Sequence, residues 1–532
     1  MMNIAEMPPI ARPPMTRSVS YPLGPHEDSV MANSAPHSSV IKSGLGLLMV
    51  LMALFVMIQY STSGVLNPDF HLHILNGQWI IGHYALPERD VFTWTASGTP
   101  YVLTQWGSEV VMAVAWLLAG GWGTKILTAL VACSLLYIMY RTANIQFRDV
   151  FGSTAATVLL AGGTLLSLQA RPEIFSYLLF AGIVLVTECW RESGRNKLLL
   201  SLPPILMVWA NLDGGYVVGL LFLVISTIGM GIGFGFKHKN HRAFWKISPF
   251  AIATLVAGIA TLINPYGVGS WDAVLSVARS ASAQSAVISE WASPTLGDRA
   301  GIQLAIVVIM MAAAAGFSRR RLRTEEFLIF AAFLVFGFAA KCNVPFFMMA
   351  MVPILSRLGA ATDFADWARP KAERKTSLVA QAAVVAIALP ILFFSGIVIK
   401  EEGEKSFRKT FSIPALVFLV ENKMTDRVMH GFDGGGYFAY SAGMKTFADR
   451  RTQLFGNRFI TGYDNAVNGR EGYREFIRAW DPKAVVLPTA SPLKTLLTTG
   501  GAYGVVFDSA TDAIIAKRGI GYDDLIAKAG RP

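Results

Sequence analysis

The chain has 532 residues, of which 53% are hydrophobic and 15% charged, and its mean hydropathy is +0.46. This composition excludes an ordinary soluble protein, because apolar runs of about 17–25 residues, long enough to cross a bilayer, recur over the first three-quarters of the sequence. The net charge of +11 would suggest a nucleic-acid partner in a soluble chain, but here it marks membrane orientation. The three cysteines indicate neither a disulfide framework nor a metal cluster.

Residues 1–43 are rich in Pro, Ser, Met and His without periodicity, which predicts a disordered tail. The tail is too long and too polar to be the first part of a cleaved signal peptide. We therefore interpret the apolar run that follows as a retained first membrane span.

Apolar runs predict an α-helical membrane domain over residues 44–399, with about eleven spans and a large first outer loop at 66–122. Within that loop, residues 106–120 predict a short helix that ends in Gly-Gly and lies along the membrane interface or re-enters it. The predicted spans are 45–65, 123–140, 152–168, 174–190, 198–211, 215–236, 248–264, 301–317, 327–340, 344–358 and 378–399.

Alternate crossing of the membrane places most basic residues on one side. Because Lys and Arg accumulate in short cytoplasmic loops, this side is predicted to be the cytoplasm, where the N-terminus also lies. The residues concerned are Arg141, Arg148, Arg191, Arg195, Lys197, Lys237, Lys239, Arg242, Lys246, Arg319, Arg320, Arg321, Arg323, Arg369, Lys371, Arg374 and Lys375.

The composition changes after the last span. Residues 400–532 contain a candidate helix at 413–423 and five short β-rich runs, RVMHGF, MKTFADRR, AVVLP, YGVVFDS and AIIAKR. This alternation predicts a small C-terminal α/β domain. An odd number of spans places it in the periplasm, on the outer side of a multi-pass protein of a bacterial inner membrane.

Three carboxylates of the first outer loop, Asp69, Asp90 and Glu109, are candidate catalytic groups. Asp69 follows Pro68 at the outer end of the first span, where partial desolvation would help a carboxylate take a proton from an acceptor hydroxyl. Paired carboxylates suit acid/base chemistry or a divalent cation. The alternative for Asp69 is a capping residue at a helix end.

His71 and His73 of the same loop would share a face on a strand and diverge on a helix. Zinc would need further ligands at suitable spacing, and the sequence offers none. We therefore predict no metal site and no required cofactor, and we interpret His73 as a residue that hydrogen-bonds or positions the acceptor.

Arg171 and Lys341 lie at the outer ends of two predicted spans, where a cation suits a phosphate held at the membrane surface. The alternative is that each side chain only extends from a helix end towards water. The same outer side gathers further polar residues that we predict to bind substrate, namely Asn211, Asp213, Asn264 and Glu290.

Two motifs of the C-terminal segment allow more than one interpretation. Asp433 begins the run DGGGY, which lacks a nucleotide-binding pattern and predicts a tight turn. The run Asp449-Arg450-Arg451 ends a predicted strand. It would bind a glycan or an anionic acceptor, or form a structural ion pair.

Eight segments together resemble a bacterial group of polytopic proteins in the GT-C glycosyltransferase superfamily, related to protein mannosyltransferases and lipid A aminoarabinose transferases. They are PDFHLHILNGQWI, LPERDVFTWTASGTPYVLTQWGSE, QARPEIFSY, VWANLDGGYVVGL, LINPYG, ISEW, GGGYF and FADRR. The resemblance implies a transferase that uses a polyprenyl-phosphate sugar on the outer face, with an acid of the first outer loop as base.

Residue by residue, the resemblance matches Asp69 to the loop carboxylate, His73 to the following histidine and Glu109 to the later acid. Arg171 and Asn264 match positions near the implied pocket. The group usually has His where this chain has Asp213, so no role is carried over to Asp213.

The leading hypothesis is therefore a membrane glycosyltransferase that transfers a sugar from a polyprenyl-phosphate donor to an envelope glycan, lipid or protein, with no nucleic-acid partner. The alternative is a non-catalytic membrane component of an envelope polysaccharide assembly or export system. A transporter is less favoured, because the sequence shows neither inverted repeats nor ionisable residues deep inside spans.

Overall fold

The structure is a computed structural model, and it describes residues 67–148, 168–237, 244–280, 288–363 and 412–529, with a few more at 152–160, 284–285 and 365. The predicted tail, the first span at 45–65 and the last span at 378–399 lie outside the described residues. The predicted span at 152–168 is described at only a few positions.

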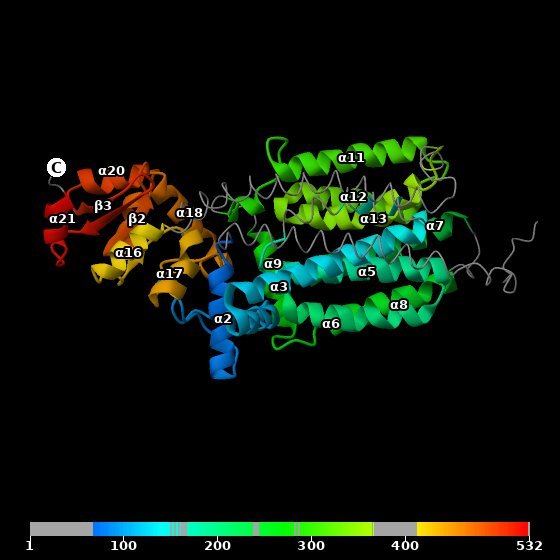
Figure 1. Cartoon of the computed structure of the whole chain (residues 1–532), viewed down its shortest axis with the longest axis horizontal. Helices are drawn as coiled ribbons and strands as arrows, with labels where there is room; N and C mark the ends of the chain where they lie inside the picture. The colour runs from blue at the N-terminus through cyan, green and yellow to red at the C-terminus, as the bar shows by residue number, and fades with distance from the viewer. Residues whose placement is uncertain are drawn as a thin grey trace, which may run out of the picture. The chain divides into compact units, whose positions relative to one another are not determined.

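A bundle of apolar helices forms the larger part of the described chain (Figure 1). Within the described residues, five helices are long and apolar enough to cross a membrane, as predicted for a multi-span protein, while the total of about eleven spans stays a prediction. The bundle as a whole includes α3 (Trp106–Phe147), α5 (Glu173–Ser193), α6 (Leu202–Leu212), α7 (Tyr216–Lys237), α8 (Phe244–Ala260), α11 (Arg299–Phe317), α12 (Thr324–Ala339) and α13 (Val344–Gly359).

Helix α3 is broken where the sequence predicts the end of a short helix. Ala119 and Gly120 have non-helical backbone angles, and Gly120 has φ of 54°, a left-handed conformation that favours glycine. The segment before the break and the segment after it correspond to the predicted interfacial helix and the following span. The Gly-Gly pair therefore sets the direction change between them.

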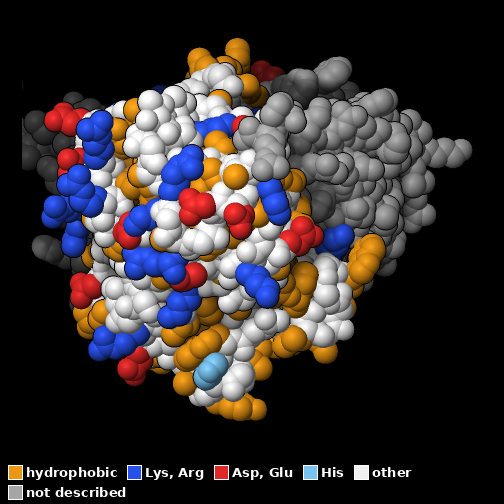
Figure 2. All heavy atoms as spheres, turned by 90° about the vertical axis from the view of Figure 1, so that its left-hand side faces the viewer, with side chains coloured by type: hydrophobic (Ala, Val, Ile, Leu, Met, Phe, Trp, Pro, Cys, Tyr) orange, Lys and Arg blue, Asp and Glu red, His pale blue; other side chains and the backbone are white. Residues whose placement is uncertain are grey.

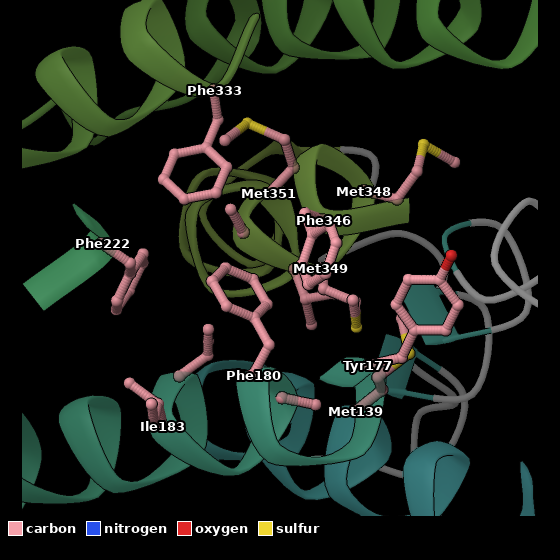
Figure 3. Close-up of a cluster of buried hydrophobic side chains, with 14 of the residues drawn as sticks. Met139, Tyr177, Phe180, Ile183, Phe222, Phe333, Phe346, Met348, Met349 and Met351 are labelled. Carbon is pink, nitrogen blue, oxygen red and sulfur yellow. The ribbon is translucent and has the colours of Figure 1, made fainter. Parts of the chain in front are cut away.

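Helix α13 forms the centre of the bundle, since it packs against α3, α5, α11 and α12 and buries its side chains over Val344–Leu358. Figure 3 shows the aromatic and methionine contacts at this centre. The rings of Phe180 on α5 and Phe346 on α13 meet edge to face with centroids 5.3 Å apart, and Phe333 of α12 lies 5.6 Å from Phe180. Such packing favours one arrangement of the helices.

Large apolar side chains are exposed on the periphery of the bundle. Leu130, Ile228, Leu255, Ile309 and Val335, from five different helices, are among them. Exposed apolar surface on this scale is unfavourable in water and favourable against lipid. The distribution fits a membrane-embedded bundle.

The first predicted loop contains a helix, α2 (Phe70–His83), which packs against α3 and against α17 (Gly435–Ala442). Gly77 allows the close approach to α3, because a Cβ at this position would lie 2.1 Å from the backbone oxygen of Glu109. Gly436 does the same for α17, where a Cβ would lie 3.0 Å from the backbone nitrogen of Leu72. The loop is thus built as a packed element.

The C-terminal segment contains a four-stranded sheet in the order β1-β2-β4-β3. β1 pairs in parallel with β2, whereas β4 pairs antiparallel with both β2 and β3. The strands are β1 (Val428–Met429), β2 (Ala484–Pro488), β3 (Tyr503–Asp508) and β4 (Asp512–Lys517). Four of the five predicted β-rich runs therefore contribute strands.

Helices cover both faces of this sheet, because successive strand residues point to opposite sides. Val486 and Ile514 pack with α16 (Ile413–Glu421), α17 and α21 (Asp523–Ala529). Val485 and Ile515 pack with α18 (Gly456–Val467), α19 (Tyr473–Trp480) and α20 (Pro492–Thr499). The prediction of an α/β fold for this segment agrees with this layering, while its boundary at residue 400 stays a prediction.

One local prediction for this segment is wrong. The run MKTFADRR is no strand, and Thr446 forms only an isolated parallel bridge with Thr93 of the first loop. The run DGGGY, predicted as a tight turn, begins in a short 3-10 helix, η5 (Phe432–Gly434), and continues into the start of α17. At MKTFADRR, tertiary contacts with the first loop overrode the local pattern.

The first loop also docks on the C-terminal segment. The backbone nitrogen of Trp94 donates to the oxygen of Thr446 at 2.9 Å, and the nitrogen of Thr446 donates to the oxygen of Phe92 at 2.9 Å. The Trp94 ring lies 5.4 Å from that of Phe447, and Arg427 lies over it at 4.8 Å. Loop and C-terminal segment therefore share a core.

Figure 2 shows a face on which basic and acidic side chains are intermixed. Several exposed pairs of this kind belong to the C-terminal segment, such as Lys517 with Asp481 at 2.7 Å and Lys494 with Asp508 at 2.6 Å.

Candidate functional site

Asp69 lies immediately before α2, and its side chain is almost fully buried. Its Oδ2 accepts a hydrogen bond from the Arg171 guanidinium at 3.1 Å and lies 3.6 Å from that of Arg450. No side-chain capping bond is made to the helix. Asp69 is thus held by tertiary ion pairs rather than by the local capping role that its position suggests.

Glu290 is the second acid of this cluster and lies in a 3-10 turn, η3 (Ser289–Trp291). Its Oε2 accepts from Arg171 at 2.8 Å and from Arg450 at 3.3 Å. Burial acts to raise the pKa of Glu290, but the two guanidinium groups lower it to about 2. The Glu290 carboxylate is therefore ionised at neutral pH, and it accepts hydrogen bonds from both arginines.

Arg171 connects these acids at the start of α5. Pro172 stands at the N-cap of that helix, so the preceding arginine leaves the helix direction and points into the cluster. Its Nε lies 3.2 Å from Glu173, and this Nε makes no hydrogen bond within the described part of the chain. Burial acts to lower the pKa of Arg171, but the surrounding carboxylates raise it well above its usual value.

Arg450 enters the same cluster from the C-terminal segment and contacts Asp69, Glu290 and, at 3.5 Å, Asp433. Its pKa is raised, because the carboxylates more than offset burial. The DRR motif is visible in the sequence, but the sequence alone does not indicate that Arg450 lies beside Asp69 and Glu290. The sequence offers two adjacent arginines after an acid as a signal. It does not reveal the partners of Arg450, because they lie up to about four hundred positions away along the chain.

His73 and Glu109 form a neighbouring buried pair, in which Nδ1 of His73 lies 2.8 Å from Oε1 of Glu109. Asn76 donates to the same oxygen at 2.9 Å. Burial acts to lower the pKa of His73, but the hydrogen bond and charge of Glu109 raise it overall. Oε2 of Glu109 and Oδ1 of Asn76 are buried without hydrogen-bond partners among the described residues.

The two histidines of the loop diverge, because α2 is helical. His71 points away from Glu109 and packs its ring against Tyr437 and Tyr440 of α17, with centroid distances of 5.0 Å and 5.4 Å. Burial lowers the pKa of His71 to about 4. The helix thus separates a histidine beside the acids from one that joins α2 to the C-terminal segment.

Lys341 lies at the same end of the bundle but has a different partner. Its Nζ is 3.1 Å from Oδ2 of Asp298, which caps α11 by accepting from the nitrogen of Gly301 at 2.9 Å. In the structure, the second cation beside Asp69 is therefore Arg450, while the phosphate role of Lys341 stays a prediction.

Asp90 belongs to a separate buried cluster. Its Oδ1 accepts from Arg451 at 2.7 Å, and its Oδ2 accepts from the backbone and side chain of Thr93 at 3.0 Å and 2.6 Å. Arg451 also binds Asp449. These contacts hold the first loop on the C-terminal segment, so the geometry suits a structural role for Asp90.

The remaining predicted site residues mostly form hydrogen bonds with nearby backbone groups. Asn211 donates to the oxygens of Met207 and Ile263, and Asn264 accepts from the nitrogen of Tyr266 at 2.8 Å within its own turn. Asp213 accepts from Gln105 at 3.0 Å and also from Ser176 and Gly215. The structure brings together Asp69, Arg171 and Glu290 directly, with His73 and Glu109 beside them.

Among the described residues, no group of three His, Cys, Asp or Glu side chains is arranged to hold a metal ion. The absence of a required metal stays a prediction.

Comparison with solved structures shows the fold. The chain matches ArnT from Cupriavidus metallidurans bound to undecaprenyl phosphate with a TM-score of 0.52 and 12% identity, over 90% of this chain and 99% of that one. The apo state of ArnT gives 0.50 and 13%, over 92% and 99%. An Archaeoglobus fulgidus oligosaccharyltransferase tethered with an acceptor peptide gives 0.49 and 12%, over 85% and 69%.

No protein-family model and no curated protein matches the sequence. The chain therefore has the fold of ArnT, and the resemblance seen in the sequence is confirmed at the level of the fold alone.

Proposed function

We propose that this chain is a membrane glycosyltransferase that transfers a sugar from a polyprenyl-phosphate donor to an envelope glycan, lipid or protein on the outer face of a bacterial inner membrane. The observation that carries the proposal is the convergence of two buried guanidinium groups, Arg171 and Arg450, on Asp69 and Glu290. The cluster of these four side chains lies at one end of a helical bundle with the GT-C fold.

The two arginines would bind the donor phosphate, because planar guanidinium groups give phosphate two directed hydrogen bonds each. The donor class is supported by ArnT, which was solved with undecaprenyl phosphate bound. An entering phosphate would compete with Asp69 and Glu290 for the same donors, and this competition would release Asp69 from its ion pairs.

Asp69 would then act as the general base. The acceptor hydroxyl oxygen attacks the anomeric carbon while the bond from that carbon to the phosphate oxygen breaks. The hydroxyl proton passes to the Asp69 carboxylate, and polyprenyl phosphate leaves with the electron pair. This single displacement inverts the configuration at the anomeric carbon.

His73 and Glu109 would position the acceptor beside this base. Both are buried, and Oε2 of Glu109 makes no hydrogen bond within the residues that the structure describes. A buried carboxylate oxygen of this kind is suited to accept from a sugar hydroxyl.

The test compares envelope glycans and lipid-linked sugars in cells with the gene, without it and with Asp69→Asn. We expect deletion to remove a sugar from the envelope and to accumulate its lipid-linked donor. Asp69→Asn should lower transfer by purified chain about 10²–10⁴-fold, the usual contribution of a general base. The matched control is Glu88→Gln, which changes an exposed acid of the same loop.

Wild-type transfer by a folded Asp69→Asn protein would exclude Asp69 as the base. Unchanged glycans and unchanged lipid-linked sugars after deletion would contradict the transferase. The second candidate, a non-catalytic component of polysaccharide assembly or export, is favoured by the pairing of Asp69 and Glu290 with arginines, as in a structural network. It predicts that Asp69→Asn lowers thermal stability while glycan composition stays unchanged.

A further inference from the structure

A hollow lined by arginines lies at the opposite end of the helical bundle. Its volume is about 560 Å³, and its lining includes Gln146, Arg148, Glu192, Arg320, Arg323 and Arg357. None of these residues takes part in the site around Asp69. Figure 1 shows that the helices which carry this end, α3, α5, α12 and α13, run side by side.

Contacts between helix ends build the walls of the hollow. Arg148 follows the last turn of α3 in a left-handed conformation, and its guanidinium lies 2.5 Å from Glu192 in the last turn of α5. Arg320, between α11 and α12, donates to Oε1 of Gln146 at 3.3 Å. Three separate connections of the bundle thus contribute side chains to one cavity.

The charges in the hollow are only partly balanced. Arg357 is buried and pairs with Glu326, and it also donates to the backbone oxygen of Arg321. Arg148 has Glu192 as its partner. Within the described residues, no carboxylate lies at ion-pair distance from Arg320 or Arg323, so no described acid neutralises these two guanidinium groups.

From this geometry we infer a second binding site, which holds the phosphodiester headgroup of an anionic membrane lipid. The hollow lies where helices long and apolar enough to span a membrane end, which is where lipid headgroups would lie. Guanidinium groups from different helix ends suit a phosphodiester, and basic pockets between such ends bind anionic lipids.

The alternative is that these basic residues only set the orientation of the chain in the membrane. This alternative explains fewer of the observations. It requires basic residues near helix ends, but it requires neither a cavity nor side chains held around it. Arg319 and Arg321 belong to the same connection and do not line the hollow, whereas Arg320 and Arg323 do. The contrast between arginines that line the hollow and arginines that do not, within one short connection, offers a direct test of the site.

The experiment measures thermal unfolding of the purified full chain in a neutral detergent with added phosphatidylglycerol, phosphatidylcholine or inorganic phosphate. We expect phosphatidylglycerol alone to raise the unfolding temperature at low concentration. The double variant Arg320→Gln with Arg323→Gln should need about tenfold or more phosphatidylglycerol for the same shift. The control is Arg195→Gln with Arg321→Gln, which removes the same charge outside the hollow and should respond as the wild type does.

Three outcomes would overturn the inference. An equal loss in both double variants would show non-specific surface charge, and equal shifts by both lipids would show no headgroup selectivity. A shift by inorganic phosphate at matching concentration would identify a soluble phosphate compound as the ligand. If the double variant does not fold, native mass spectrometry of Arg320→Gln alone should show less bound phosphatidylglycerol than Arg321→Gln, and equal retention would contradict the site.

Discussion

The Arg171 guanidinium donates to the Asp69 carboxylate across 3.1 Å, although 102 positions separate the two residues in the sequence. The proposed base and the proposed phosphate ligand therefore form an ion pair with each other in the structure. In the proposed mechanism, the donor phosphate exchanges with a carboxylate. Binding of the donor would then also free the Asp69 carboxylate to act as the base.

Arg450→Gln should weaken donor binding more than Lys341→Gln does. Arg450 contacts Asp69 and Glu290, while Lys341 pairs with Asp298. Loss of a charge-assisted contact predicts a rise of about tenfold or more in KM for the polyprenyl-phosphate sugar, with a smaller change in kcat. Steady-state kinetics with a labelled donor measure both constants. A larger KM effect at Lys341 would restore the assignment made from the sequence.

Glu290→Gln should tighten binding of polyprenyl phosphate. Because the pKa of Glu290 is about 2, its carboxylate is ionised at neutral pH and competes with phosphate for Arg171 and Arg450. Removal of this competition predicts a gain of roughly fivefold in affinity, about 1 kcal/mol. Equilibrium binding of the lipid phosphate tests the direction. Weaker binding would instead assign Glu290 the role of holding the arginines in place.

Gly77→Ala and Gly82→Ala should have opposite effects, although both lie in α2. A Cβ at Gly77 would meet the backbone oxygen of Glu109 at 2.1 Å, whereas a Cβ at Gly82 meets nothing within 4 Å. Overpacking at Gly77 should destabilise by about 1–3 kcal/mol. Gly82→Ala should stabilise by about 0.5–1 kcal/mol, since alanine restricts the unfolded chain. Thermal unfolding in detergent compares them, and similar effects would contradict the described crossing of α2 and α3.

The stability contributed by His73 should fall as the pH rises. Glu109 raises the folded-state pKa of His73 above its unfolded value, so the folded protein holds the proton more tightly. This contribution is complete below about pH 6.5 and is lost as the pH rises through the higher folded value. The difference in unfolding temperature between wild type and His73→Gln should therefore shrink towards alkaline pH. A difference that grows towards alkaline pH would contradict the pairing of His73 with Glu109.

Local patterns predicted much of the fold. Apolar runs located the helices of the bundle, and the Gly-Gly pair at 120–121 located the break in α3. β-rich runs located four strands. These features depend on neighbouring residues, through hydropathy, period and backbone freedom. The same reasoning missed α2 as a helix and predicted a strand at MKTFADRR, where tertiary contacts with the first loop decide the conformation.

The sequence by itself determined the membrane character of this protein, since its composition requires a lipid environment. Its combined motifs gave only a resemblance to the GT-C superfamily. It also placed Asp69, Arg171 and Glu290 at one end of the bundle through the alternation of spans. Only the tertiary structure decided that Arg450, and not Lys341, contacts these acids. The physical reason is that ion pairing depends on distance in space, which the packing of α2 against α3 and α17 sets, and not on distance along the chain.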